Sequence, residues 1–123
     1  MAEIVFKELS FAIVGAAIEV HKILGVAFLE AVYQRALAYE FALRNVPFEE
    51  QKPLPVHYKG QLVGEYRADF VVAGKIIVEF KAASSITDEH MSQALNYLAA
   101  TGYRLAIIIN FGAESLQHKR IVK

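Results

Sequence analysis

The sequence predicts a mixed α/β domain in which helices flank a central mixed sheet, and three observations support this prediction. Apolar residues recur at helical spacing over the first third of the chain. Apolar runs bounded by glycine and proline follow, which is typical of strands. A helical segment long enough for a crossover then separates two of these strands. The predicted order is α-α-β-β-β-α-β-β, with a parallel, right-handed connection around the third helix.

Two helices are predicted near the N-terminus. The first covers residues 4–24 and ends at Gly25. The second covers roughly residues 28–44. It carries two neighbouring stripes, of which one is apolar and the other holds Glu30 and Tyr33. The apolar stripe consists of Leu29, Val32, Ala36, Tyr39 and Leu43.

Three strands are predicted in the middle of the chain. The first covers residues 54–59, and Pro53 and Pro55 indicate an edge strand or the start of a strand. Residues 62–72 and 75–82 are expected to form a hairpin around a glycine.

One helix and two strands are predicted in the C-terminal part. The helix covers residues 88–100, with Thr87 as its N-cap and Gly102 at its end. Residues 103–111 contain a continuous apolar run, which predicts a central strand buried on both faces. Residues 118–122 are expected to form a short last strand.

Length and composition limit the classes of function. A chain of 123 residues with 55% hydrophobic residues predicts one domain, residues 1–123, with a core of its own. The absence of cysteine excludes disulfides, zinc thiolate sites and cysteine nucleophiles. Basic and acidic residues number 13 each, so any binding of nucleic acid must depend on a local patch, a metal ion or an oligomer. The uncharged run of residues 9–18 is too short to span a bilayer, and the N-terminus is not basic. We therefore expect a soluble cytoplasmic protein that does not bind membranes.

The segment of residues 67–81 is the most informative part of the chain. It places Asp69, Glu79 and Lys81 on two otherwise apolar strands. Charged groups in such strands are costly unless they are paired or bind a ligand. Carboxylate oxygens are the ligands that Mg²⁺ prefers, and a nearby ammonium can orient a water or bind a phosphate. The alternative interpretation is a solvated cross-strand ion pair.

The hairpin register decides whether these side chains meet. Arg67 and Asp69 are expected on one face of the first strand, and Glu79 and Lys81 on one face of the second. A two-residue loop would place Asp69 opposite Val78, whereas a three-residue loop would place it opposite Glu79. A shared metal site therefore predicts an odd loop, a bulge, or strands that splay at Asp69.

Polar residues on two helices extend this set of candidates. His90, Gln93 and Tyr97 fall at i, i+3 and i+7 and form a polar side of the helix that follows Lys81. Taken alone, they are typical of a half-exposed helix face. Glu30, taken alone, is typical of a solvated glutamate.

Several motifs recur together along nearly the whole chain. They lie in residues 17–25, 28–33, 51–60 and 110–112, in Asp69 with Glu79-Phe80-Lys81, and in Gln93-Ala94-Leu95-Asn96-Tyr97-Leu98. In this order they resemble the GxxExxY proteins, a group of small bacterial and archaeal proteins assigned to the PD-(D/E)XK nuclease superfamily. The resemblance implies a restriction-endonuclease-like core and a metal-dependent nuclease that hydrolyses phosphodiester bonds of DNA or RNA.

The resemblance also implies a set of metal ligands. Asp69 and Glu79 would bind Mg²⁺ or Mn²⁺, and the Phe80 carbonyl would add a ligand. Glu30 would complete the shell from its helix, directly or through water.

Further residues are implied to handle the substrate. Lys81 would orient the attacking water or stabilise charge at the phosphorus, and Gln93 would position the phosphate or Lys81. Tyr97, Tyr33 and Arg67 are additional candidates for substrate positioning.

Two other functions stay open at this stage. A catalytically silent nuclease-fold module that binds nucleic acid or a partner protein would suit the zero net charge. A structural oligomer is suggested only by the apolar content. Nucleic acid is the expected partner, while a homodimer and an unidentified protein partner are left open.

Overall fold

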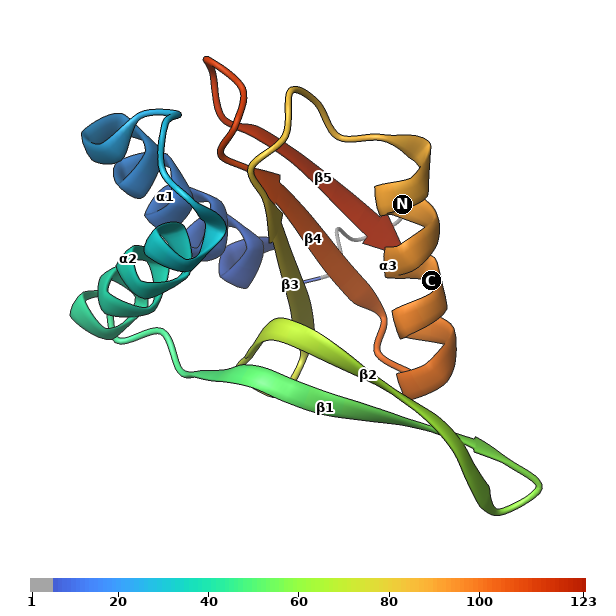
Figure 1. Cartoon of the computed structure of the whole chain (residues 1–123). Coiled ribbons are helices and arrows are strands. Elements are labelled where there is room, and N and C mark those ends of the chain that lie inside the picture. The colour runs from blue at the N-terminus through green and yellow to red at the C-terminus, as the bar shows by residue number, and fades with distance from the viewer. Residues whose placement is uncertain (1–5) are drawn as a thin grey trace, which may run out of the picture.

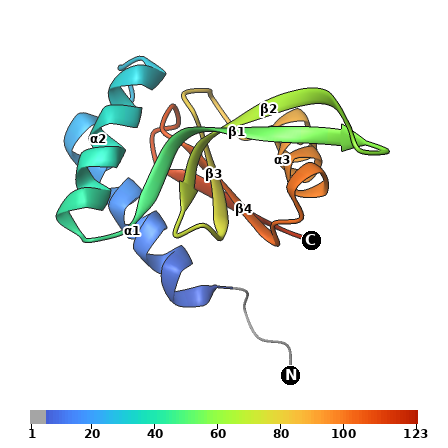
Figure 2. The same cartoon turned by 90° about the horizontal axis from the view of Figure 1, so that it is seen from below.

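The computed structural model describes residues 6–123, in which five strands form one mixed sheet with helices on both faces (Figures 1 and 2). The helices are α1 (Lys7–Leu24), α2 (Glu30–Leu43) and α3 (Asp88–Thr101). The strands are β1 (Phe48–Tyr58), β2 (Gln61–Val72), β3 (Ile76–Lys81), β4 (Leu105–Asn110) and β5 (Gln117–Val122). The strands lie in the order β1-β2-β3-β4-β5, and β3 and β4 are parallel while the other neighbours are antiparallel. The predicted class and element order are confirmed; the predicted start of the first helix at residue 4 lies outside the described residues.

The sheet separates two hydrophobic cores. Helices α1 and α2 cover one face and α3 covers the other (Figure 2). Every residue of β4 is buried, which confirms the central strand predicted from the apolar run. Its side chains alternate between the two cores, as a strand requires. Leu105, Ile107 and Ile109 lie in the core under α1 and α2, and Ala106 and Ile108 in the core under α3.

Helix α2 buries a different stripe from the apolar one in the sequence. Tyr33, Leu37 and Phe41 are fully buried, whereas Leu29 and Tyr39 are 79% and 67% exposed. The two buried aromatic rings meet rings of the sheet region: Tyr33 stacks on a phenylalanine at 4.6 Å, and Phe41 packs edge-on against another at 5.4 Å. Aromatic rings bury large areas and gain from such ring pairs, so they decide which face of α2 turns inward.

Strand β1 begins six residues earlier than predicted, at Phe48 instead of residue 54. Pro53 and Pro55 lie inside it. They are tolerated because β1 is the edge strand of the sheet, where one side makes no ladder hydrogen bonds. The prolines therefore mark the edge correctly but not the start of the strand.

The hairpin of β2 and β3 has a three-residue loop. Val72 pairs with Ile76, and Ala73 and Gly74 both adopt positive φ angles of 54° and 65°. Extending this register along the two strands places Asp69 opposite Glu79. The odd loop required for a shared site is therefore present, and the two-residue alternative is wrong.

The long β1–β2 hairpin bends at one residue pair. Gln51 and Asp69 lie opposite each other but are missing from the run of paired residues, and Gln51 has a φ of 48°. On β2, Ala68 packs in the core under α3, while Phe70 packs in the core under α1 and α2. Residues two apart in a regular strand share a face, so β2 must turn over at Asp69. The tip of the hairpin extends beyond the body of the molecule (Figure 1).

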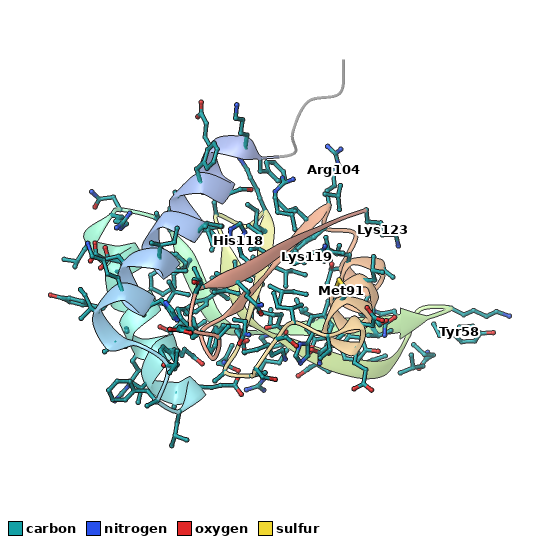
Figure 3. The ribbon with its side chains drawn as sticks, turned by 90° about the horizontal axis from the view of Figure 1, so that it is seen from above. Tyr58, Met91, Arg104, His118, Lys119 and Lys123 are labelled. Atoms are coloured by element: carbon teal, nitrogen blue, oxygen red, sulfur yellow. The ribbon has the colours of Figure 1, made fainter. Side chains whose placement is uncertain are left out.

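The other edge of the sheet carries basic side chains. Figure 3 places Lys119 on β5, with Lys123 and Arg104 near the end of that strand. Lys119 lies opposite Ile108, which lies opposite Glu79, so Lys119 adds positive charge on the face that carries Glu79. Lysines on an edge strand also discourage pairing with another chain.

Between residues 6 and 123, no helix combines the length and apolar character needed to cross a membrane.

Because Gln51 adopts a left-handed conformation, we expect glycine to be more stabilising than alanine at this position, which is the reverse of the usual order in a strand. Gln51→Gly and Gln51→Ala both remove the side-chain hydrogen bonds, but only glycine adopts φ near 48° without strain. We expect the Gly variant to be more stable than the Ala variant by about 1 kcal/mol in chemical denaturation. At Glu65, an exposed residue of β2 with ordinary φ, the order should be reversed. A more stable Ala variant at Gln51 would contradict the strained bend.

Candidate active site

The candidate site lies at the end of the β2–β3 ladder. There, two side-chain carboxylates accept amide hydrogen bonds that backbone carbonyls accept elsewhere in the ladder. The Asp69 amide N–H donates to Glu79 Oε2 at 2.9 Å, and the Phe80 amide N–H donates to Asp69 Oδ2 at 3.0 Å. Each carboxylate therefore accepts a backbone hydrogen bond from the facing strand. These two bonds satisfy amide groups that the ladder would otherwise pair, and they fix both side chains on the side of the sheet that faces α3.

Glu79 is 5% exposed, and its environment favours the protonated form. Burial raises the pKa of Glu79 to about 9, and a hydrogen bond to Asp69 and repulsion from its charge add to the rise. The backbone hydrogen bond and the Lys81 ammonium act in the opposite direction. Two carboxyl groups this close cannot both be ionised cheaply, so the pair holds a proton at neutral pH unless a cation replaces it.

Helix α3 brings two of the predicted residues, Gln93 and Tyr97, to the carboxyl groups and to Lys81 of β3. Lys81 Nζ donates to Gln93 Oε1 at 3.3 Å, and the Tyr97 hydroxyl lies close enough to Glu79 to interact with its carboxyl group. Burial, followed by the charges of Glu79 and Asp69, raises the pKa of Tyr97 to about 12, so its hydroxyl keeps its proton and can donate it. The polar side of this helix therefore faces the hairpin.

His90, the first residue of that polar side, has a different role. Its Nδ1 accepts from the Thr87 amide, while the Thr87 hydroxyl oxygen accepts from the His90 amide. The two residues form a reciprocal cap that satisfies amide groups at the start of α3. Thr87 is thus confirmed as the N-cap, and His90 supports the helix rather than the carboxyl pair.

Two glutamines that were not predicted as site residues connect α2 to Asp69. Gln51 Nε2 lies 2.9 Å from Gln34 Oε1 and 3.4 Å from Asp69 Oδ1. Gln34 also donates to Glu50 at 3.2 Å. Gln51 could have been predicted from its position opposite Asp69. That position follows only when β1 begins at Phe48 and not at residue 54.

Glu30 is exposed and stands at the first position of α2, one helical turn before Gln34. Residues four apart share a helix face, so Glu30 lies on the face that reaches Asp69 through the glutamines. It does not join the carboxyl pair directly. Within residues 6–123, no three His, Cys, Asp or Glu side chains lie close enough together to hold a metal ion.

The remaining candidates lie away from the carboxyl groups. Tyr33 is fully buried, and its hydroxyl donates to the Gly25 carbonyl, so it offers no surface to a substrate. Arg67 is exposed, and the turnover of β2 at Asp69 places it on the opposite face of the strand from Asp69, contrary to the shared face expected from alternation. The Phe80 side chain is buried beside the site, and its amide supports Asp69.

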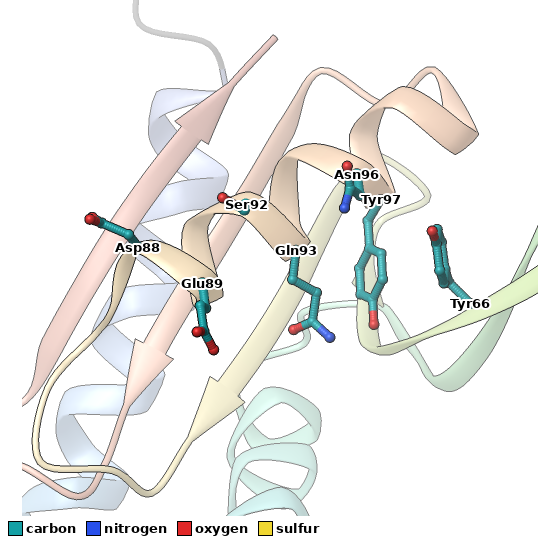
Figure 4. Close-up of a pocket in the computed structure, with 7 residues that line it drawn as sticks. All are labelled: Tyr66, Asp88, Glu89, Ser92, Gln93, Asn96 and Tyr97. Carbon is teal, nitrogen blue, oxygen red and sulfur yellow. The ribbon is translucent and has the colours of Figure 1, made fainter.

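A pocket of about 440 Å³ opens beside the carboxyl pair. Six of its lining residues come from α3 and one, Tyr66, reaches it from β2 (Figure 4). Gln93 and Tyr97 belong to this wall as well as to the site. Tyr66 was not among the predicted site residues.

The arrangement as a whole suits chemistry on an anionic, metal-bound substrate. Two carboxyl groups, an ammonium, an amide and a phenol converge from β2, β3 and α3. A comparison of the sequence with models of protein families gives a match. The model described as PD-(D/E)XK nuclease superfamily matches residues 7–121. Searches of curated proteins and of solved structures return no match.

The proton held by the carboxyl pair predicts a specific pH dependence of stability. The folded chain keeps this proton between about pH 4.5, where an ordinary glutamate loses it, and about pH 9. The unfolded chain binds fewer protons in this window, so the free energy of unfolding falls as the pH rises. Glu79→Gln has no such proton to lose. Between pH 5 and pH 8.5, the free energy of unfolding of the variant should therefore rise by at least about 1 kcal/mol relative to that of wild type.

Denaturation with urea across this pH range provides the measurement. Glu65→Gln, at an exposed position of β2, is the matched control and should run parallel to wild type. A Glu79→Gln curve that also runs parallel would show that Glu79 is ionised in the folded chain.

Proposed function

The chain belongs to the PD-(D/E)XK nuclease superfamily, and from this membership we propose that it hydrolyses phosphodiester bonds of DNA or RNA with Mg²⁺ or Mn²⁺. The observation that carries the proposal is the pairing of Asp69 with Glu79 at the end of the β2–β3 ladder, with Lys81 on the same face of β3. The finer resemblance to GxxExxY proteins stays a prediction.

The donor atoms fit a hard divalent cation. Asp69 and Glu79 offer carboxylate oxygens, and a cation between them would replace the proton that their repulsion now requires. Mg²⁺ commonly binds through one or two carboxylates and fills its remaining positions with water and substrate phosphate. The lack of a third acidic ligand in the described chain therefore agrees with a magnesium site. The Phe80 carbonyl, and Glu30 through a water, are the further ligands that we propose.

The chain's own residues would divide the remaining work. A bound metal would neutralise the phosphate and lower the pKa of a water. Lys81, on the same face as Glu79, would orient the attacking water or stabilise charge that develops on the phosphoryl oxygens. Gln93 fixes the direction of the Lys81 ammonium through their hydrogen bond. Tyr97, whose hydroxyl keeps its proton beside Glu79, would donate to the carboxyl group and help to position it.

A second candidate function is supported by exposed apolar surface. Phe11 and Ile18 on α1 are 68% and 51% exposed, and they line one groove together with Val14. Exposed apolar surface of this kind is typical of contact with another protein. A catalytically silent module that binds a partner protein or a second copy of the chain would use this surface and would leave the carboxyl pair without turnover.

Cleavage assays with matched variants test the proposal. Wild type should cleave labelled single- or double-stranded DNA or RNA in Mg²⁺ or Mn²⁺. Asp69→Asn and Lys81→Met should each lower the rate by about a hundredfold or more, because each removes a group that acts on the reacting phosphate. Lys59→Ala, which removes an exposed lysine at the tip of the β1–β2 hairpin, should cleave like wild type.

Equal cleavage by wild type and Asp69→Asn would mean that the activity belongs to a contaminant. Binding of nucleic acid or of a partner protein by a wild type that cleaves no substrate would favour the silent module instead.

A further inference from the structure

The pocket beside the carboxyl pair shares two walls with the candidate active site. Gln93 accepts a hydrogen bond from Lys81 and also lines the pocket, and Tyr97 lies beside Glu79 and also lines the pocket. A group bound in this pocket would therefore lie directly beside a phosphate held at Asp69 and Glu79. In a nucleic acid, the group next to a phosphate is a nucleoside.

The lining of the pocket suits a nucleobase and not a phosphate. It contains no lysine or arginine, and Asp88 and Glu89 would repel a second phosphate. Ser92 and Asn96 offer neutral donors and acceptors, and the two carboxylates can accept hydrogen bonds from the amino groups of bases. These groups come from successive turns of α3, while Tyr66 lies beside Tyr97 at one end of the row (Figure 4).

Tyr66 adds an aromatic ring from β2 to the lining of the pocket. The residue is 40% exposed, and its ring lies 5.0 Å from the Tyr97 ring at an interplanar angle of 36°. A tyrosine with this exposure keeps part of its side chain accessible to a ligand. Every nucleobase can stack on an aromatic ring, and base stacking on aromatic side chains is the usual means by which proteins hold unpaired strands.

The bend at Gln51 and Asp69 puts Tyr66 there. Tyr66 lies opposite Leu54, and Leu54 packs in the core under α3. Cross-strand partners share a face, so Tyr66 also turns toward α3. Without the turnover of β2 at Asp69, Tyr66 would point away from α3. The same backbone irregularity thus positions both a carboxylate and the tyrosine.

We propose that this pocket binds one unpaired base of the substrate, stacked on Tyr66, directly beside the phosphate at the carboxyl pair. The pocket thereby selects single-stranded DNA or RNA, because a base inside a duplex is stacked on both faces and paired along its edge. The inference rests on the proposed function for the position of the phosphate. Stacking of the base itself requires neither a metal ion nor cleavage.

Fluorescence of 2-aminopurine in short single-stranded oligonucleotides tests stacking without metal. Deoxy and ribo versions, and the same strands in blunt duplexes, are titrated with wild-type protein in EDTA. Wild type should quench the single strands and bind them at least about tenfold more tightly than the duplexes. Tyr66→Ala should weaken single-strand binding by about tenfold and abolish the quenching, whereas Tyr66→Phe keeps the ring and should stay within about twofold of wild type.

Tyr58→Ala is the matched control. Tyr58 is 62% exposed at the far tip of the same hairpin (Figure 3), outside the pocket, so its loss should leave binding unchanged. Loss of quenching in Tyr66→Ala alone supports the base pocket. Equal binding of single strands and duplexes, or equal loss in Tyr66→Ala and Tyr58→Ala, overturns it.

The two proposals fail separately. Cleavage that depends on Asp69 but prefers duplexes and survives Tyr66→Ala would overturn the base pocket and leave the nuclease standing. Quenching that depends on Tyr66 in a protein without cleavage would support the pocket and overturn the nuclease.

Discussion

Two carboxyl groups held against each other at the end of the β2–β3 ladder form the constraint on which the rest of the site depends. Asp69 and Glu79 each accept an amide hydrogen bond from the facing strand, so neither can move away without leaving a backbone donor unpaired. Burial and mutual repulsion make this arrangement costly for two negative charges. A protein that keeps such a pair beside a lysine has a strong physical reason to bind a cation there.

The bend at Gln51 and Asp69 connects this constraint to the shape of the molecule. It turns β2 over, so that Phe70 packs in the core under α1 and α2 while Ala68, two residues earlier, packs in the core under α3. It interrupts the β1–β2 ladder at Asp69, brings Gln51 against that carboxylate and directs Tyr66 toward α3. Strained backbone persists where the surrounding structure holds it in place, and here the flanking ladder does so.

The sequence was sufficient to predict the class, the element order and the parallel connection around α3, because apolar periodicity and a crossover helix determine these features. It could not decide between a two- and a three-residue loop, since that choice depends on Ala73 adopting a left-handed conformation that alanine rarely takes. The sequence showed two stripes on α2 without deciding which one turns inward, because that choice depends on the ring packing of Tyr33 and Phe41 against the sheet region. Tyr66 and Gln51 were not predicted as site residues, because their positions depend on the bend at Gln51 and Asp69, and no local sequence pattern predicts this bend.

The most direct test of the central claim is calorimetric titration of Mn²⁺ into wild type, Asp69→Asn and Glu65→Gln at neutral pH, in two buffers with different enthalpies of ionisation. We predict one Mn²⁺ site in wild type and in Glu65→Gln, with close to one proton released on binding, because the cation replaces the proton that the pair holds. Asp69→Asn should bind far more weakly. Equal binding by wild type and Asp69→Asn, or binding without proton release, would contradict the account of Asp69 and Glu79 as a proton-sharing metal site.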